Sequence, residues 1–181
     1  EPDQKFRESV LREVVNETGA TVVHPYNDER IMAGQGTCAK EMLEDIPTLD
    51  IIVSPVSGGG LLSGTLVASK NMKNSIKVFG AEPDEADDAF QSLKHGKIIP
   101  NKTINTVCDG LRAEIGSKTF PVIQDLVDGI ETVSEKEILE SLRMIWERMK
   151  IIVEPSCSIS LAMVIKNSNL FKNKNVGLIM S

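Results

Sequence analysis

The residues with the clearest capacity for chemistry form one short run, Ser57 to Gly60, of which three are consecutive glycines. The run lies between an apolar stretch and a helical pattern, and without Cβ atoms its backbone can adopt positive φ angles. Backbone N–H groups can then converge on one point at the positive end of the following helix dipole. This run, called the glycine loop below, predicts a phosphate-binding site; a tight strand-to-helix turn without a ligand is the alternative.

A second candidate site is the acidic segment from Glu82 to Asp88, which holds five carboxylates in seven residues. Carboxylate oxygens suit a hard cation such as Mg²⁺ or Ca²⁺. On composition alone, however, a solvated loop that places acids at a helix N-terminus is the favoured interpretation. Glu82 also follows a strand pattern, as the ribose-binding acid of a dinucleotide fold does, so a nucleotide-binding domain remains an alternative.

Alternating strand and helix patterns position these two segments. A strand pattern at 49–53, a helical pattern at 61–72 and a strand pattern at 76–81 together have the size of one βαβ unit. The chain is therefore expected to adopt an α/β fold of three layers, with a largely parallel sheet flanked by helices. We further expect helices at about 6–15, 37–46, 135–150 (after a Ser134–Glu137 capping box) and 159–165, and strands at 21–23, 129–133 and 176–180.

Length, charge and cysteine content disfavour several classes of protein. The chain has 181 residues, with 20 Lys and Arg against 26 Asp and Glu, so its net charge of −6 disfavours nucleic acid and anionic membranes as partners. Its apolar runs fall short of the ~20 residues that span a bilayer. Three scattered cysteines, Cys38, Cys108 and Cys157, form no paired motif and favour a reducing, cytoplasmic setting. Because a buried-strand pattern reaches Ser181 and no strand precedes the first helix, we expect a domain that is incomplete at both ends.

Several motifs in register resemble one family, the pyridoxal-phosphate (PLP) enzymes of fold type II, whose architecture is that of the tryptophan synthase β subunit. Within that family the chain is most similar to the serine racemases and serine/threonine dehydratases, and the resemblance spans essentially all 181 residues. The motifs that carry it are Ala33 to Thr37, Pro55 to Gly64, Ala81 to Pro83, Asp109 to Leu111, Trp146-Glu147, Val153 to Ser156 and Leu178 to Ser181.

The resemblance implies a set of cofactor contacts. The family has four glycines in its phosphate loop, and Ser57 replaces the first of them here. Ser181 would meet the pyridine nitrogen, and Tyr26 stands where the family often has Asn near the cofactor. The residues expected to hold the phosphate are Ser57, Gly58, Gly59, Gly60 and Leu61.

The resemblance also reverses the composition-based interpretation of the acidic segment. It implies that Glu82, the carbonyl of Ala86 and Asp88 bind Mg²⁺, Ca²⁺ or Mn²⁺. Arg7 and Asp109 would orient the serine hydroxyl that acts as acid and base. Lys150 would lie near an ATP effector at the interface of a homodimer.

The implied activity is that of a serine racemase. The α-proton of L-serine is removed; reprotonation on the opposite face gives D-serine, and loss of the β-hydroxyl gives pyruvate and ammonia. A serine/threonine dehydratase without significant racemase activity is the alternative within the family. A nucleotide-binding α/β domain and a non-catalytic dimerisation or regulatory module are the alternatives outside it.

The resemblance also implies that part of the catalytic machinery is not in this chain. The Schiff-base lysine and the loop that holds the substrate carboxylate would lie upstream of Glu1. Residues 1–181 would then form the larger, phosphate-binding domain, inactive without the rest.

Overall fold

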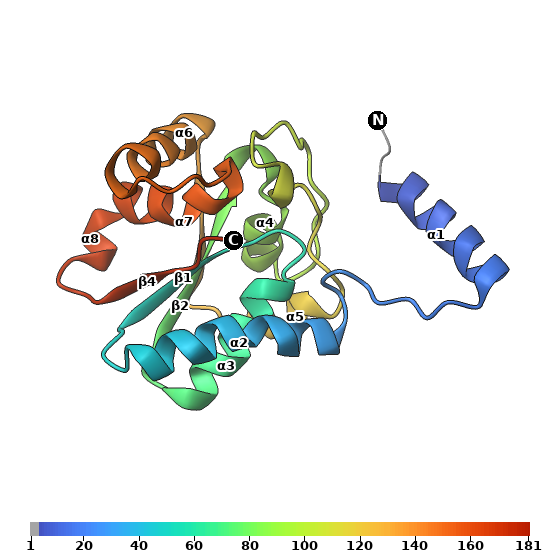
Figure 1. Cartoon of the computed structure of the whole chain (residues 1–181), viewed down its shortest axis with the longest axis horizontal. Helices are drawn as coiled ribbons and strands as arrows, with labels where there is room; N and C mark the ends of the chain where they lie inside the picture. The colour runs from blue at the N-terminus through green and yellow to red at the C-terminus, as the bar shows by residue number, and fades with distance from the viewer. Residues whose placement is uncertain (1–3) are drawn as a thin grey trace.

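The computed structural model describes residues 4–181, apart from the side chains of residues 4, 5 and 7. It contains helices, strands and three single-turn elements η1–η3, of which η3 is a π-helical turn (Figure 1). In chain order they are α1 (Gln4–Thr18), α2 (Glu29–Asp45), β1 (Ile51–Pro55), α3 (Gly60–Met72), β2 (Lys77–Pro83), η1 (Asp84–Ala86), α4 (Asp88–His95), η2 (Asp109–Leu111), α5 (Thr119–Leu126), β3 (Gly129–Val133), α6 (Glu135–Met144), η3 (Ile145–Met149), α7 (Pro155–Lys166), α8 (Ser168–Phe171) and β4 (Val176–Leu178).

The four strands form one parallel sheet in the order β3-β2-β1-β4. The parallel sheet and the βαβ unit β1-α3-β2 are confirmed. In a parallel sheet the carboxyl ends of the strands meet at one edge, and ligands bind there. The glycine loop follows β1, the acidic segment begins at the end of β2, and Ser181 follows β4, so the topology brings them to the same edge.

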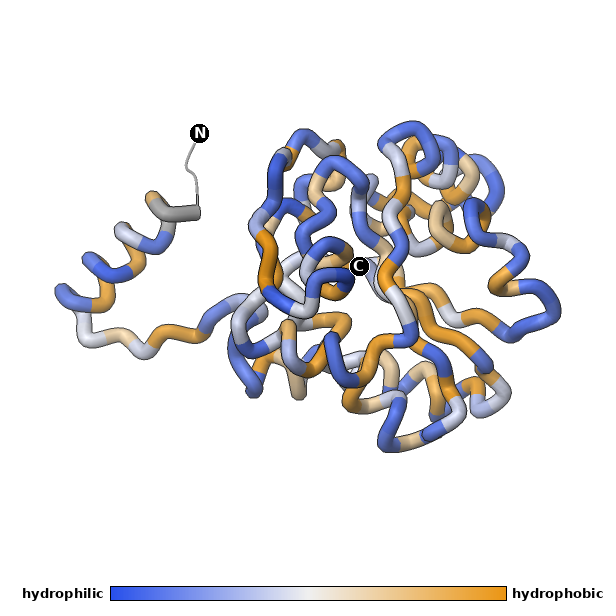
Figure 2. The backbone as a smooth tube through the Cα atoms, turned by 180° about the vertical axis from the view of Figure 1, so that it is seen from behind, coloured by the Kyte–Doolittle hydropathy of each residue, from blue (hydrophilic) through white to orange (hydrophobic). Residues whose placement is uncertain are grey.

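Helices cover both faces of the sheet, as the three-layer prediction requires. Along β1, Ile52 packs with residues of α2, α3 and α5, whereas Ile51 and Val53 pack with residues of α6, α7 and α8. Seen from behind, the apolar residues follow the strands through the centre of the body (Figure 2). Such two-sided burial explains why β1, which lies two residues beyond the predicted 49–53, begins with three consecutive apolar residues, Ile51 to Val53.

Some local predictions are confirmed and others are wrong. The capping box of α6 is present, with the Glu137 carboxylate accepting from the Ser134 amide at 2.8 Å. Residues 21–23 form no strand, because no neighbouring strand pairs with them in the described chain. Helix α2 begins at Glu29, well before the predicted start, since Asp28 caps it by accepting from the Arg30 amide at 2.9 Å.

Helix α1 stands away from the body and is joined to α2 by an extended segment (Figure 1). Its apolar side chains are exposed, among them Phe6 at 59% and Val14 at 44%. None of the helices among residues 4–181 is long and apolar enough to cross a membrane.

Candidate functional site

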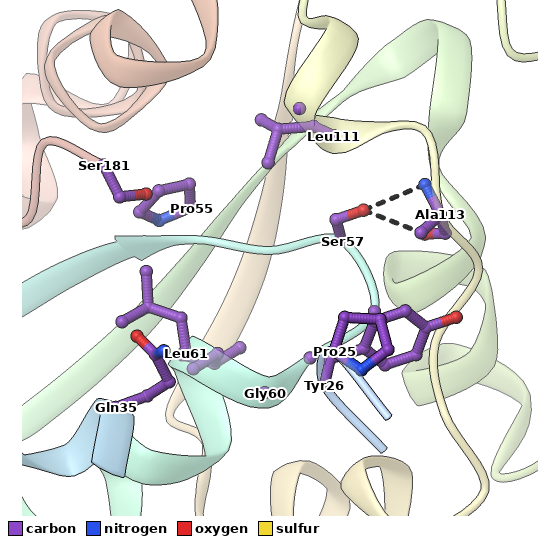
Figure 3. A pocket seen from close by; sticks show the side chains of 14 residues that line it. Pro25, Tyr26, Gln35, Pro55, Ser57, Gly60, Leu61, Leu111, Ala113 and Ser181 are labelled. Carbon is purple, nitrogen blue, oxygen red and sulfur yellow. Dashed lines mark hydrogen bonds between the residues drawn. The ribbon is translucent and has the colours of Figure 1, made fainter. Parts of the chain in front are cut away.

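A pocket of about 300 Å³ opens at the carboxyl edge of the sheet. The glycine loop and the start of α3 form its floor, Tyr26 and the residues around Ala113 close one side, and Ser181 lies across from them (Figure 3). Four segments far apart in the sequence therefore contribute to a single cavity: the turn before α2, the loop after β1, residues 110–113 and the segment after β4.

Residues outside the pocket lining fix the orientation of one peptide plane in the glycine loop. The Gly58 carbonyl accepts from the Gly116 amide at 3.1 Å and from the Thr119 hydroxyl at 2.7 Å. In a planar trans peptide the following N–H points the opposite way, so the Gly59 amide points away from Thr119. Within the described residues no hydrogen bond takes up the amides of residues 57–61. Amides without a partner at a helix N-terminus are suited to bind an anion, so the loop before α3 is a candidate anion site.

The glycines of the loop are required by their neighbours. Gly59 has φ +88°, a left-handed conformation that favours glycine. A Cβ at Gly58 would overlap the Tyr26 ring, and a Cβ at Gly60 would lie 2.9 Å from the Tyr26 Cβ. Tyr26 thus packs directly on the loop, in edge-to-face contact with His24 at a ring-centroid distance of 4.6 Å.

Ser57 differs from the loop's glycines in having a side chain to use. Its hydroxyl donates to the Ala113 carbonyl and accepts from the Ala113 amide, both at 3.0 Å (Figure 3). The hydroxyl is therefore engaged with residue 113, which leaves the Ser57 backbone amide as the group available to a ligand.

Ser181 lies on the side of the pocket opposite Tyr26, as does the polar side chain of Gln35 (Figure 3). The Cys157 thiol, at the start of α7, donates to the Ser181 carbonyl at 3.0 Å. A planar ligand lying between the loop and Ser181 would meet amide donors at one end and a hydroxyl at the other.

The remaining sequence-derived candidates lie outside this lining. Asp109 is exposed at the start of η2 and accepts from the Gly110 amide at 3.1 Å, while the neighbouring Gly110 and Leu111 line the pocket. Lys150 is exposed at the end of η3, in a left-handed conformation with φ 59°. The side chain of Arg7 is outside the described residues.

The acidic segment places two carboxylates in the interior. Glu82 is 1% exposed and accepts from the amides of Ala89 and Phe90 at 3.0 and 2.8 Å. Asp88 is equally buried and accepts from the Ile115 amide at 2.6 Å and from the Asn101 side chain at 2.9 Å.

Both buried acids have raised pKa values. Burial, and next the charge of Asp88, raises the pKa of Glu82 well above its usual range. Burial also raises the pKa of Asp88, to about 6. Their chemistry suits a cation, which would favour the ionised forms. Among residues 4–181, however, no group of three or more His, Cys, Asp or Glu could hold a metal ion, so the candidate set is two carboxylates and the buried carbonyl of Ala86.

The raised pKa of Asp88 predicts an unusual pH dependence of stability. Its pKa lies above the value of about 3.9 expected when the chain is unfolded, so the folded state binds the proton more tightly. In EDTA, the Asp88 contribution to the free energy of unfolding should rise by about 1 kcal/mol as the pH falls from 7 to 5. Urea midpoints measured across this window should rise less, or fall more, in Asp88→Asn than in the wild type. Parallel pH profiles for the two proteins would contradict the assignment.

The sequence analysis did not single out two residues of the site. Thr119 orients the Gly58 carbonyl, and Asn101 binds Asp88 from a loop without regular structure. Pro121 in the first turn of α5 is a helix-start signal that could have drawn attention to Thr119. Asn101 has no comparable signal in the sequence.

Comparison with known proteins identifies the family. The model of the family described as "Pyridoxal-phosphate dependent enzyme" matches residues 1–181. The chain belongs to this family, and the nucleotide-binding alternative gives way to a cofactor whose phosphate fits the unpaired amides of the glycine loop.

Three relatives show which members of the family the chain is similar to. A serine racemase of Arabidopsis thaliana is 48% identical over the whole chain and 56% of the relative. A beta-hydroxyaspartate dehydratase of Paracoccus denitrificans is 41% identical over the whole chain and 58% of the relative. The structure of maize serine racemase superposes with a TM-score of 0.95 at 41% identity, covering 99% of this chain and 57% of that one. The chain thus spans little more than half the length of these relatives.

Proposed function

We propose that the complete protein is a PLP-dependent serine racemase that also eliminates water from serine to give pyruvate and ammonia. The observation that carries this proposal is the pocket itself, in which the amides of residues 57–61 have no hydrogen-bond partner among the described residues and lie across from Ser181. The similarity to serine racemases at up to 48% identity supports the choice of reaction.

Each part of the pocket has a role in this proposal. The amides of the glycine loop and of Leu61 bind the cofactor phosphate, and Tyr26 packs behind them. The Ser181 hydroxyl donates to the ring nitrogen, which keeps that nitrogen largely unprotonated. When bound, PLP supplies an electron sink for the pair of electrons left by the α-proton. Leu111, which is 7% exposed, limits the access of water to the same cavity.

The proton transfers need groups beyond the pocket residues of this chain. We propose that Arg7 and Asp109 orient the serine hydroxyl that moves one proton, and that residues 1–181 form the phosphate-binding domain of a longer protein. The Schiff-base lysine and the substrate-carboxylate loop would then come from outside these residues. The share of each relative that the chain covers supports this division.

The test uses the complete protein and L-serine. A racemase forms D-serine, and the side reaction forms pyruvate; both are measured in one incubation, by chiral chromatography and a coupled assay. Pyruvate without D-serine would replace the proposal with the dehydratase alternative, which the beta-hydroxyaspartate dehydratase relative favours. If neither product forms and borohydride reduction leaves no pyridoxyl adduct, both the racemase proposal and the dehydratase alternative are wrong.

We also propose that Glu82, the Ala86 carbonyl and Asp88 bind Mg²⁺, supported by the burial of both acids and their raised pKa values. Mg²⁺ added to EDTA-treated protein at pH 8 should raise the thermal unfolding midpoint by a few degrees. Asp88→Asn should abolish this shift. Asp84→Asn, which changes an exposed acid of the same segment, should retain it. An equal shift in all three proteins would place the ion elsewhere.

The assembly and setting of the complete protein follow the same proposal. We propose a cytoplasmic homodimer, with Lys150 near an ATP effector at its interface. The exposure of Trp146 at 48% and Ile152 at 95%, on either side of Lys150, supports an interface there, and the three free thiols support the reducing setting. Light scattering with and without ATP tests the assembly; a monomer in both conditions would contradict it.

A further inference from the structure

The glycine loop has little capacity to fix its own conformation. Three of its four residues lack side chains, and glycine loses more conformational freedom on folding than any other residue. Its amides nevertheless have to stay aimed into the pocket if they are to bind an anion without first being ordered by it. The contacts that fix the loop therefore decide how well it binds.

One such contact comes from Thr119, which is fully buried. Its hydroxyl is 2.7 Å from the Gly58 carbonyl and 3.1 Å from the Gly116 carbonyl, and it accepts from the Gly116 amide at 3.0 Å. The hydroxyl has a single proton, and the shorter distance favours its donation to Gly58. This bond, together with the longer one of 3.1 Å from the Gly116 amide to the same carbonyl, sets the plane of the peptide whose N–H belongs to Gly59, the residue with positive φ.

A second side-chain contact comes from Ser57, the one residue of the loop that has a side chain. The Ser57 hydroxyl uses its donor and an acceptor position on the two backbone groups of Ala113. Residues 57 and 58 are thus fastened, one after the other, to the single segment 113–119. We call the hydroxyls of Ser57 and Thr119 the hydroxyl clamp.

The segment that the clamp grips is itself anchored on several sides. The Ile115 amide donates to Asp88 at 2.6 Å, and the Lys118 amide donates to the Asn27 side chain at 2.7 Å. Phe120 and Ile123, just beyond it, lie in the core cluster beside the sheet. The clamp therefore ties the glycine loop to a segment that other parts of the protein hold in place.

We propose that Ser57 and Thr119 are positioning residues for the cofactor phosphate, and that their hydroxyls pre-organise the glycine loop so that its amides face the pocket before the phosphate arrives. This inference rests on the proposed function, in which the amides of residues 57–61 hold that phosphate. Neither side chain needs to touch the cofactor: each acts through the backbone that it holds.

The test compares Thr119→Val, Thr119→Ser and Ser57→Ala in the complete protein after removal of the cofactor. Valine has nearly the shape of threonine without its hydroxyl, and serine keeps the hydroxyl without the methyl group. For each variant the dissociation constants of PLP and of pyridoxal, which lacks the phosphate, are measured by absorbance titration. The ³¹P resonance of bound PLP reports the environment of the phosphate, and the unfolding midpoint of the cofactor-free protein reports stability.

Loss of one hydrogen bond corresponds to a change in affinity of about 3- to 10-fold. We expect Thr119→Val to weaken PLP binding by about 10-fold, to leave pyridoxal binding unchanged and to shift the ³¹P resonance towards that of free PLP. Thr119→Ser, which keeps the hydroxyl, should leave the PLP affinity, the pyridoxal affinity and the ³¹P resonance close to those of the wild type. Ser57→Ala should show the same selectivity with an effect of about 3-fold, and it serves as the test if the buried Thr119→Val does not fold.

A purely structural role gives a different pattern. If the variants lower the unfolding midpoint but leave the ratio of PLP to pyridoxal affinity and the ³¹P resonance as in the wild type, the clamp does not position the phosphate and the inference is wrong. The wild type is measured first. If it binds PLP no better than pyridoxal, the proposed phosphate site itself fails, which is distinct from failure of the clamp alone.

Discussion

Gly58→Asp should remove the cofactor from the complete protein. The new side chain brings a carboxylate into a loop whose amides are arranged for an anion, and its Cβ overlaps the Tyr26 ring. Because juxtaposed like charges cost several kcal/mol, we expect PLP affinity to fall by at least about 100-fold. The loss is measured in two ways: by the absorbance of the purified protein in the cofactor band, and by titration of the cofactor-free protein with PLP.

Gly58→Asn is the matched control, since asparagine has the size of aspartate without its charge. It should weaken PLP binding by the steric part alone, which Tyr26→Ala in the same protein should relieve. Charge therefore accounts for the difference between the Asp and Asn variants. Normal cofactor content in Gly58→Asp would show that the phosphate binds elsewhere, and would remove the basis of the proposed function.

Gly64→Ala should give the largest loss of stability among single-methyl changes between α2 and α3. A Cβ at Gly64 would overlap the Met32 carbonyl and lie 2.6 Å from the Gly36 amide. Both neighbours are backbone of α2, which cannot turn aside as a flexible side chain can. We expect the free energy of unfolding to fall by about 3 kcal/mol, the upper range for overpacking. Urea denaturation of the wild type and the variant measures it.

Gly34→Ala introduces the same methyl group into the same helix pair at an open position. No atom lies within 4 Å of the place that its Cβ would take, and glycine in a helix is less favourable than alanine by about 1 kcal/mol. This variant should therefore be as stable as the wild type or slightly more so. Equal losses at both positions would mean that the close approach of α2 and α3 does not limit stability.

The accuracy of the sequence-based predictions follows from what each residue contacts. The strands at 49–53 and 76–81 were predictable because burial on both faces demands consecutive apolar residues. The start of α2 was not, because Gly34 and Gly36 interrupt its apolar period while Gly36 serves a close contact with Gly64. Residues 21–23 have strand propensity but lack a neighbouring strand, and propensity alone does not form one.

In the site, too, features of adjacent residues were predictable from the sequence, and contacts between distant residues were not. The glycine loop was recognisable because its unusual composition lies within four adjacent residues. The bonds of Thr119 to Gly58 and of Asn101 to Asp88 join residues 61 and 13 positions apart, and neither has a local pattern. The resemblance predicts that Tyr26 lies near the cofactor, and this stays a prediction; its packing on Gly58 was not predictable, because it depends on the turn that His24 and Asn27 form.

The pairing of β4 with β1 has a consequence for synthesis of the protein. Ile51 pairs with Val176, so the edge of the sheet that carries Ser181 is built from segments made more than a hundred residues apart. A nascent chain can release the glycine loop and its anchoring segment from the ribosome long before Ser181 emerges. Until then the phosphate end of the pocket can form without its opposite wall, and long-range parallel pairing is slow in any case. Under the proposed function, capture of the cofactor with its ring seated against Ser181 therefore waits until β4 and Ser181 have been made and have paired with β1.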